Sequence, residues 1–122
     1  MVTQSSLFDR LGGSPAIYAA AEILYRKVLA DPLLAPYFDG VDMKRQVAKQ
    51  TAFLTMALGG PNRYTGRDLR TAHAGLAGLS DEHVDRVLAH LAETLREHGV
   101  CDEDIAAAGA AAASTRDDVL NR

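Results

Sequence analysis

The chain has 122 residues, which is long enough for one domain with a hydrophobic core and too short for two. Its net charge of -3, with 24% charged and 48% hydrophobic residues, gives no electrostatic basis for binding nucleic acid or an acidic membrane surface. A single cysteine, Cys101, excludes an internal disulfide; without a leader pattern or an apolar run of about 20 residues, we expect a cytoplasmic protein with no membrane span.

Helical patterns fill most of the first half, and the chain has no alternating strand pattern and no internal repeat. A short first helix is predicted before Gly12-Gly13, with Ser5 or Ser6 as its cap. Ser14 as N-cap, followed by Pro15, predicts the start of a second helix. Its inward face carries Ile17, Ala21, Leu24, Tyr25 and Val28. The two prolines of "DPLLAPYF" (31–38) predict a tight, short helical connection.

Helix start and stop patterns also divide the second half. Residues 42–58 are predicted to form a helix that ends at Gly59-Gly60. The turn-rich "PNRYTGRDL" (61–69) leads to a short helix that carries His73. Ser80 is predicted to cap a helix that ends at Gly99, and the alanine-rich residues 102–121 form the last helix. The sequence therefore predicts one all-α domain over residues 1–122, with about six helices, two of them short.

Four residues break the patterns around them. Gln46 and Gln50 lie one turn apart on an otherwise apolar helix face, where an unpartnered buried amide costs about 1–3 kcal/mol. Tyr25 needs a partner for its hydroxyl, and His73 lies in a small-sided apolar stretch. Singly, each has an ordinary interpretation: glutamines at the solvent edge, a core tyrosine and a structural histidine. Together they indicate a polar spot in an apolar pocket with an imidazole available, which is what a haem site requires.

Several stretches also resemble a known family. "LFDRLGG", "YRKVLADPLLAPYF", "VDMKRQVAKQTAFLTMALGGPNRYTGRDLRTAH" and the ending "DVLN" are similar to the group I truncated haemoglobins of cyanobacteria and actinobacteria. The resemblance covers nearly the whole chain, and "ALGGPNRYTGRDLRTAH" is its most specific part. It implies a two-over-two helical sandwich around haem b.

The resemblance also implies roles for individual residues. His73 matches the proximal iron ligand, and Phe38 matches the phenylalanine that stacks on the haem. Tyr25, Gln46 and Gln50 match the distal residues whose donors stabilise bound O2; without ligand, we expect the two amides to satisfy one another. Positions that usually touch the haem or its propionates are matched by Lys49, Phe53, Tyr64 and Leu69.

The chain departs from the cyanobacterial members at two places. They carry a histidine where this chain has Lys49, and another before the final "DVLN" that can bond to a haem vinyl group, where this chain has "ASTRD". We therefore expect the haem to be held non-covalently. Lys49 could pair with a haem propionate as an ammonium or ligate the iron as a neutral amine. We favour the propionate, because lysine gives up its proton reluctantly.

The implied function is the binding of O2 and other diatomic gases, such as NO and CO, for O2 transport, storage or sensing. The alternative is a nitric oxide dioxygenase that converts NO to nitrate with an external reductase. A haem-free helical interaction module would explain the helices but not the "YTGRDLRTAH" match. His83, His90 and His98 are interpreted as structural or exposed, since the spacing of the first two is poor for one metal ion.

Overall fold

The computed structural model describes residues 6–60, 70–71, 73–76 and 78–122, and the regular structure in these residues is all helical. The elements are α1 (Leu7–Arg10), α2 (Gly13–Leu29), the 3-10 helix η1 (Ala35–Phe38), α3 (Met43–Ala57), α5 (Asp81–Glu97), α6 (Asp102–Ala113) and α7 (Arg116–Leu120). Arg70, Thr71 and His73 are helical as well. The all-α prediction is therefore confirmed.

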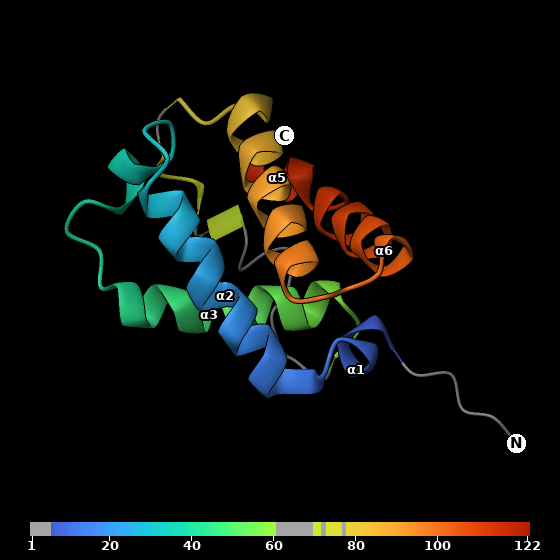
Figure 1. The fold of residues 1–122 in the computed structure, drawn as a ribbon. Coiled ribbons are helices and arrows are strands. Elements are labelled where there is room, and N and C mark those ends of the chain that lie inside the picture. Colours follow the sequence, from blue (N-terminus) through green and yellow to red (C-terminus); the bar gives the residue numbers. More distant parts are fainter. Residues whose placement is uncertain (1–5, 61–69, 72, 77) are drawn as a thin grey trace, which may run out of the picture.

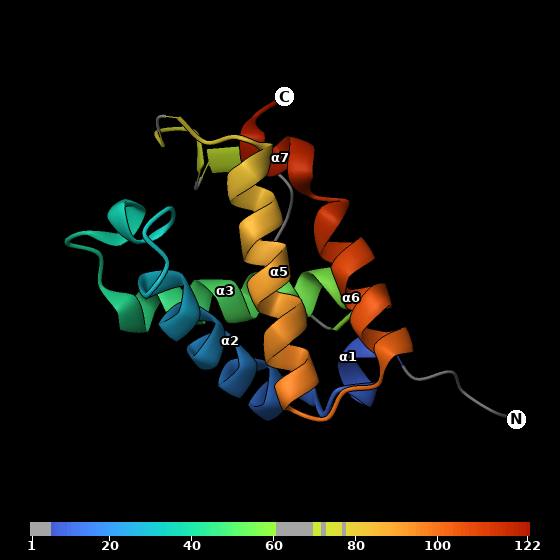
Figure 2. The ribbon, with the colours of Figure 1, turned by 45° about the horizontal axis from the view of Figure 1, so that its top comes forward.

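The four longer helices form two layers. α2 packs across α3, and α5 packs beside α6, while α2 also contacts α5 and so joins the layers. Figure 1 shows α2 crossing α3, and Figure 2 shows α5 and α6 running side by side. Within the described part of the chain, no helix combines the length and apolar character that crossing a membrane requires.

Both ends of α3 lie where the sequence places them. At its start, the Asp42 carboxylate accepts hydrogen bonds from the backbone N–H groups of Lys44 and Arg45, at 3.1 and 3.3 Å. At its end, the N–H of Gly59 donates to Met56 O and that of Gly60 to Thr55 O. Gly59 has a φ of 86°, a conformation that favours glycine, so the glycine pair ends the helix as predicted.

The start of α2 differs from the prediction. The helix begins at Gly13 with Gly12 as its N-cap, not after a Ser14 cap. Gly12 has a φ of 110° and Gly13 a φ of 71°, values that residues with a Cβ rarely adopt. The glycine pair therefore ends α1 and turns the chain directly into α2.

The alanine-rich C-terminal segment also differs, because it forms two helices and not one. α6 ends before Ser114, and α7 begins after Thr115. The two hydroxyls donate to Ala111 O and Ala112 O, each at 2.6 Å. Hydroxyls that bond to nearby carbonyl groups compete with the helix backbone, which accounts for the break at this point.

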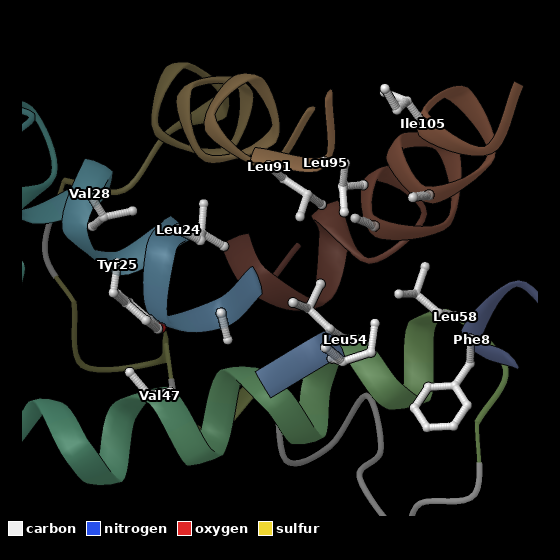
Figure 3. Close-up of a cluster of buried hydrophobic side chains, with 14 of the residues drawn as sticks. Phe8, Leu24, Tyr25, Val28, Val47, Leu54, Leu58, Leu91, Leu95 and Ile105 are labelled. Atoms are coloured by element: carbon white, nitrogen blue, oxygen red, sulfur yellow. The ribbon is translucent and has the colours of Figure 1, made fainter. Parts of the chain in front are cut away.

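The hydrophobic core lies between the two layers. The predicted inward face of α2, from Ile17 to Val28, is buried, and Leu54 meets it from α3. Figure 3 shows Leu24, Leu91 and Leu95 converging from α2 and α5, while the ring of Tyr25 points from α2 toward α3. Each fully buried leucine contributes about 1.5–3 kcal/mol. This core fixes the positions of the helices that carry the functional side chains.

Candidate functional site

A cavity of about 320 Å³ lies among α2, η1, α3 and α5, and its lining is mainly apolar. The volume falls within the range of roughly 300–1,000 Å³ that is typical of small-molecule and cofactor pockets. The lining includes every predicted site residue that the structure describes: Tyr25, Phe38, Gln46, Lys49, Gln50, Phe53 and His73. The other two predictions, Tyr64 and Leu69, lie outside the described residues.

Three of these side chains form a hydrogen-bonded relay. Gln46 Nε2 donates to the hydroxyl oxygen of Tyr25 at 3.1 Å, and the Tyr25 hydroxyl donates to Gln50 Oε1 at 3.2 Å. The two amides therefore do not satisfy one another directly, as we expected, but through the tyrosine between them. Because the relay uses only the carbonyl oxygen of Gln50, it leaves both N–H donors of that amide outside these bonds.

Tyr25 is held by its ring as well as by its hydroxyl. The residue is 6% exposed, and its ring packs edge-on against Phe38 with centroids 5.4 Å apart and an interplanar angle of 73°. Aromatic pairs favour this geometry. η1 carries Phe38 to this position, so the short helical connection predicted from the prolines supplies one wall of the cavity.

His73 and Lys49 reach the cavity in different ways. His73 is half-buried, and its backbone carbonyl accepts a hydrogen bond from the N–H of Leu76 at 3.1 Å, which closes a turn after the imidazole. Lys49 lies on α3 between the two glutamines and is exposed while it lines the cavity. The lysine therefore lies at the rim of the cavity, where its ammonium stays hydrated.

A second imidazole in the lining was missed by sequence reasoning. His83, interpreted as structural or exposed, lines the cavity and packs edge-on against Tyr37, with ring centroids 5.5 Å apart. Its Nδ1 accepts a hydrogen bond from the backbone N–H of Ser80 at 3.2 Å and lies 3.0 Å from the Ser80 hydroxyl. The sequence contains one indication of this role: His83 lies three residues after the Ser80 cap, a position from which side chains commonly bond to the cap residue.

The remaining histidines are structural. His98, the residue after the end of α5, has its Nδ1 2.8 Å from Thr94 O. His90 Nε2 lies 2.8 Å from a carboxylate oxygen of Asp31, whose side chain is only 3% exposed. Asp31 also accepts hydrogen bonds from Arg86 and from the backbone N–H of Leu33. The hydrogen bond from His90, followed by those from Leu33 and the charge of Arg86, holds the pKa of Asp31 below its ordinary value.

Comparison with known proteins agrees with this geometry. The family model described as "Bacterial-like globin" matches residues 6–121. A group 1 truncated hemoglobin of Chlamydomonas moewusii is 50% identical over 117 residues, which cover 95% of this chain and 68% of that protein. One from Synechocystis sp. is 44% identical over 97% of this chain and 99% of its own length. The chain therefore belongs to the bacterial-like globins and, within them, to the group 1 truncated haemoglobins.

Solved structures establish the fold. The 2/2 hemoglobin of Synechococcus sp. PCC 7002, solved in the cyanomet state with covalently attached heme, superposes with a TM-score of 0.89 at 40% identity. The alignment covers 97% of this chain and 100% of that one. The Fe(III) form of the truncated hemoglobin of Tetrahymena pyriformis gives a TM-score of 0.87 at 42% identity, over 94% of this chain and 97% of that one. The two helical layers are thus the two-over-two globin fold.

Proposed function

We propose that this chain binds haem b non-covalently, with the His73 imidazole as the protein ligand of the iron, and that it binds O2 and other diatomic gases such as NO and CO. One observation carries the proposal: a single apolar cavity is lined by an imidazole, by the Gln46–Tyr25–Gln50 relay and by Phe38. The names of the relatives, which are truncated hemoglobins, support it.

The described residues fit the chemistry of a haem. The porphyrin is a flat apolar ring, and aliphatic side chains of α2 and α5 form part of the mainly apolar lining that would receive it. Its propionates are anionic, and the exposed ammonium of Lys49 lies at the rim of the cavity. Iron in globins takes an imidazole ligand, and His73 contributes an imidazole to the lining.

The relay residues would control how long a gas stays in the cavity. Haem, when bound, supplies the iron at which diatomic gases are held reversibly. Gln50 then offers N–H donors to a ligand that accepts hydrogen bonds, and Tyr25 fixes the Gln50 amide through its carbonyl oxygen. Gln46 in turn fixes the Tyr25 hydroxyl. Hydrogen bonds in a mainly apolar cavity are stronger than in water, so we expect slow release of O2.

The nitric oxide dioxygenase alternative would use the same cavity. It adds an electron donor to the requirements, because the conversion of NO and O2 to nitrate consumes one electron, which an external reductase would have to replace for repeated turnover. No described residue favours this reaction over reversible O2 binding. We therefore propose gas binding as the function, with the purified O2-loaded protein mixed with NO as the assay for the alternative.

Haem titration of the purified chain tests the proposal. We expect stoichiometric uptake with a Soret band, and loss of the native spectrum in His73→Gly, with recovery when free imidazole is added. His83→Gln is the matched control, because it removes the other imidazole in the lining and should leave the spectrum intact. A chain that stays colourless, or a His73→Gly spectrum identical to that of the wild type, would contradict the proposal.

The mode of attachment has its own test. The Synechococcus structure contains covalently attached heme. In this chain the "ASTRD" segment before the "DVLN" ending contains no histidine, and its Thr115 lines the cavity. Acidified butanone should therefore extract all of the haem from the loaded protein. Colour that remains with the polypeptide would show a covalent bond.

A further inference from the structure

The C-terminal helix α7 is bonded to the helical residues that precede His73. Arg70 Nε donates to Asp118 Oδ1 at 2.7 Å, and Asn121 Nδ2 donates to the backbone carbonyl oxygen of Arg70 at 3.2 Å. Both bonds connect residues about fifty positions apart in the sequence. In Figure 2, the yellow-green helical piece lies beside α7 near the C-terminus. Asp118 and Asn121 therefore hold Arg70 by its side chain and by its backbone at the same time.

Asn121 has an unusual backbone conformation at this contact. Its φ of 55° and ψ of 46° are left-handed, and among the described residues it is the one non-glycine residue with a positive φ. Asparagine tolerates this region better than most residues, yet the conformation persists only where the surroundings favour it. At this position it ends α7 and accompanies the hydrogen bond to Arg70.

α7 is itself held in place from the other side. Arg116 pairs with Asp81 and Asp85 of α5, at 2.9 and 2.6 Å. α7 also contributes one residue, Val119, to the lining of the cavity. α7 is thus fixed against α5, which forms a long wall of the same cavity.

We propose that Asp118 and Asn121 form a C-terminal strut that positions His73 for its role as ligand. The inference rests on the proposed haem function. Residues three apart lie on the same side of a helix, so Arg70 and His73 share one face and a displacement of the first moves the second. Groups that orient a metal ligand affect both affinity and ligand geometry. The strut also accounts for the "DVLN" ending, because Asp118 and Asn121 bind Arg70 while Val119 lines the cavity.

The strut is tested with Asp118→Asn and Asn121→Gly. Glycine adopts the left-handed conformation freely, so the second variant removes the amide without adding backbone strain. The readouts are the rate of haem transfer to excess apomyoglobin and the Fe–His stretching band of the ferrous protein in resonance Raman spectra. Each variant should transfer haem about two- to fivefold faster, as expected for the loss of one partly exposed polar contact, and should shift or broaden the Fe–His band.

Two controls separate the strut from other effects. Glu103→Gln removes an exposed carboxylate of α6 that does not line the cavity, and it should change neither readout. Ile105→Val weakens the buried core outside the cavity lining and should leave the Fe–His band in place even if stability falls. Unchanged readouts in both strut variants would overturn the inference while the haem function stands. A wild-type chain that takes up no haem would remove the proposed function and the strut together.

Discussion

Tyr25 connects three contacts at the scale of a single residue. Its hydroxyl accepts from Gln46 and donates to Gln50, and its ring packs edge-on against Phe38. Loss of the hydroxyl would leave the Gln46 amide without its acceptor and the Gln50 carbonyl without its donor. Both amides are half-buried, and an amide that loses its partner is free to rotate, so we expect the hydroxyl to affect a gas ligand through the order it imposes on its two neighbours.

Tyr25→Phe should therefore speed the release of O2 by more than tenfold. A hydrogen bond to a charged group contributes about 1.5–3 kcal/mol, and we expect a loss of this size when the donors that face bound O2 become disordered. Stopped-flow displacement of O2 by CO measures the rate. Tyr18→Phe, which changes an exposed tyrosine of the same helix outside the cavity lining, is the matched control and should match the wild type. An unchanged rate in Tyr25→Phe would show that the relay does not control release.

Lys49→Ala distinguishes the two roles open to the lysine. Because Lys49 is exposed at the rim, we expect it to pair with a propionate, so the variant should keep the ferric spectrum of the wild type and lose haem about two- to fivefold faster. Lys44→Ala removes an exposed lysine of α3 that does not line the cavity and serves as the control. A low-spin ferric spectrum in the wild type at neutral pH that disappears in Lys49→Ala would instead assign the amine to the iron.

Much of the site could be predicted from residue pattern and resemblance, and the exceptions have physical causes. Gln46, Gln50 and Tyr25 stood out because polar groups on apolar faces need partners, and the structure bonds them to one another. His83 was missed because one ring has two roles: it accepts a hydrogen bond from the Ser80 N–H at the start of α5, and it also lines the cavity. Asp31 was missed because its partners, Arg86 and His90, lie on a helix far along the chain.

At the scale of elements, α1 is fastened to the end of α3. The backbone N–H of Phe8 donates to Leu58 O at 2.9 Å, and the Phe8 ring covers Gly60. A Cβ at Gly60 would lie 2.6–2.8 Å from atoms of that ring, closer than side chains approach one another. The second glycine of the predicted helix stop is therefore required for the close approach of α1, in addition to ending α3.

Gly60→Ala should lower the free energy of unfolding by about 1–3 kcal/mol, the usual effect of overpacking a core contact. Urea unfolding followed by circular dichroism measures it. Gly109→Ala provides a control of opposite sign: a Cβ there meets nothing within 4 Å, and alanine inside α6 should stabilise the chain by about 0.5–1 kcal/mol. Equal effects of the two substitutions would contradict the proposed packing of Phe8.

Element boundaries show what local sequence can and cannot determine. The start of α3 at Asp42 and its end at Gly59 followed from the capping residues themselves. The break between α6 and α7 did not, because alanine favours a helix on both sides and only the hydroxyls of Ser114 and Thr115 mark it. The start of α2 was misplaced because Ser14 and Pro15 are a typical helix start, whereas the left-handed Gly12 is the actual cap.

At the scale of the whole molecule, Asp31 joins the two layers. Its carboxylate lies after the end of α2 and binds Arg86 and His90 of α5. The turn that contains Asp31 leads into η1, which carries Phe38 to the cavity. Near the end of α2, Lys27 also pairs with Glu93 and Glu97 of α5. The hydrogen bond from His90 and the other contacts lower the pKa of Asp31, so its ionised form stabilises the folded state.

Asp31→Asn should lower the melting temperature near neutral pH, and the difference from the wild type should narrow in acid. The pKa of this carboxyl is lowered from 3.8 by folding. Its stabilisation is therefore fully present above that value and is lost as pH falls through the lower pKa of the folded state. Melting curves from pH 7 down to pH 3 measure the effect, with Asp39→Asn, an exposed carboxylate after η1, as control. A difference in melting temperature between Asp31→Asn and the wild type that stays constant with pH would show that the charge of Asp31 does not stabilise the fold.

The two hydrogen bonds of the Gln46–Tyr25–Gln50 relay run in one direction, so the two amides at its ends expose different polar groups. The Tyr25 hydroxyl accepts from one amide and donates to the other, so these two bonds use neither the carbonyl oxygen of Gln46 nor the N–H groups of Gln50. Reversal would require both amides to rotate together. A group that accepts hydrogen bonds should therefore be favoured beside Gln50, and a group that donates them beside Gln46. The two glutamines, although chemically identical, would then present opposite hydrogen-bonding groups to a bound molecule.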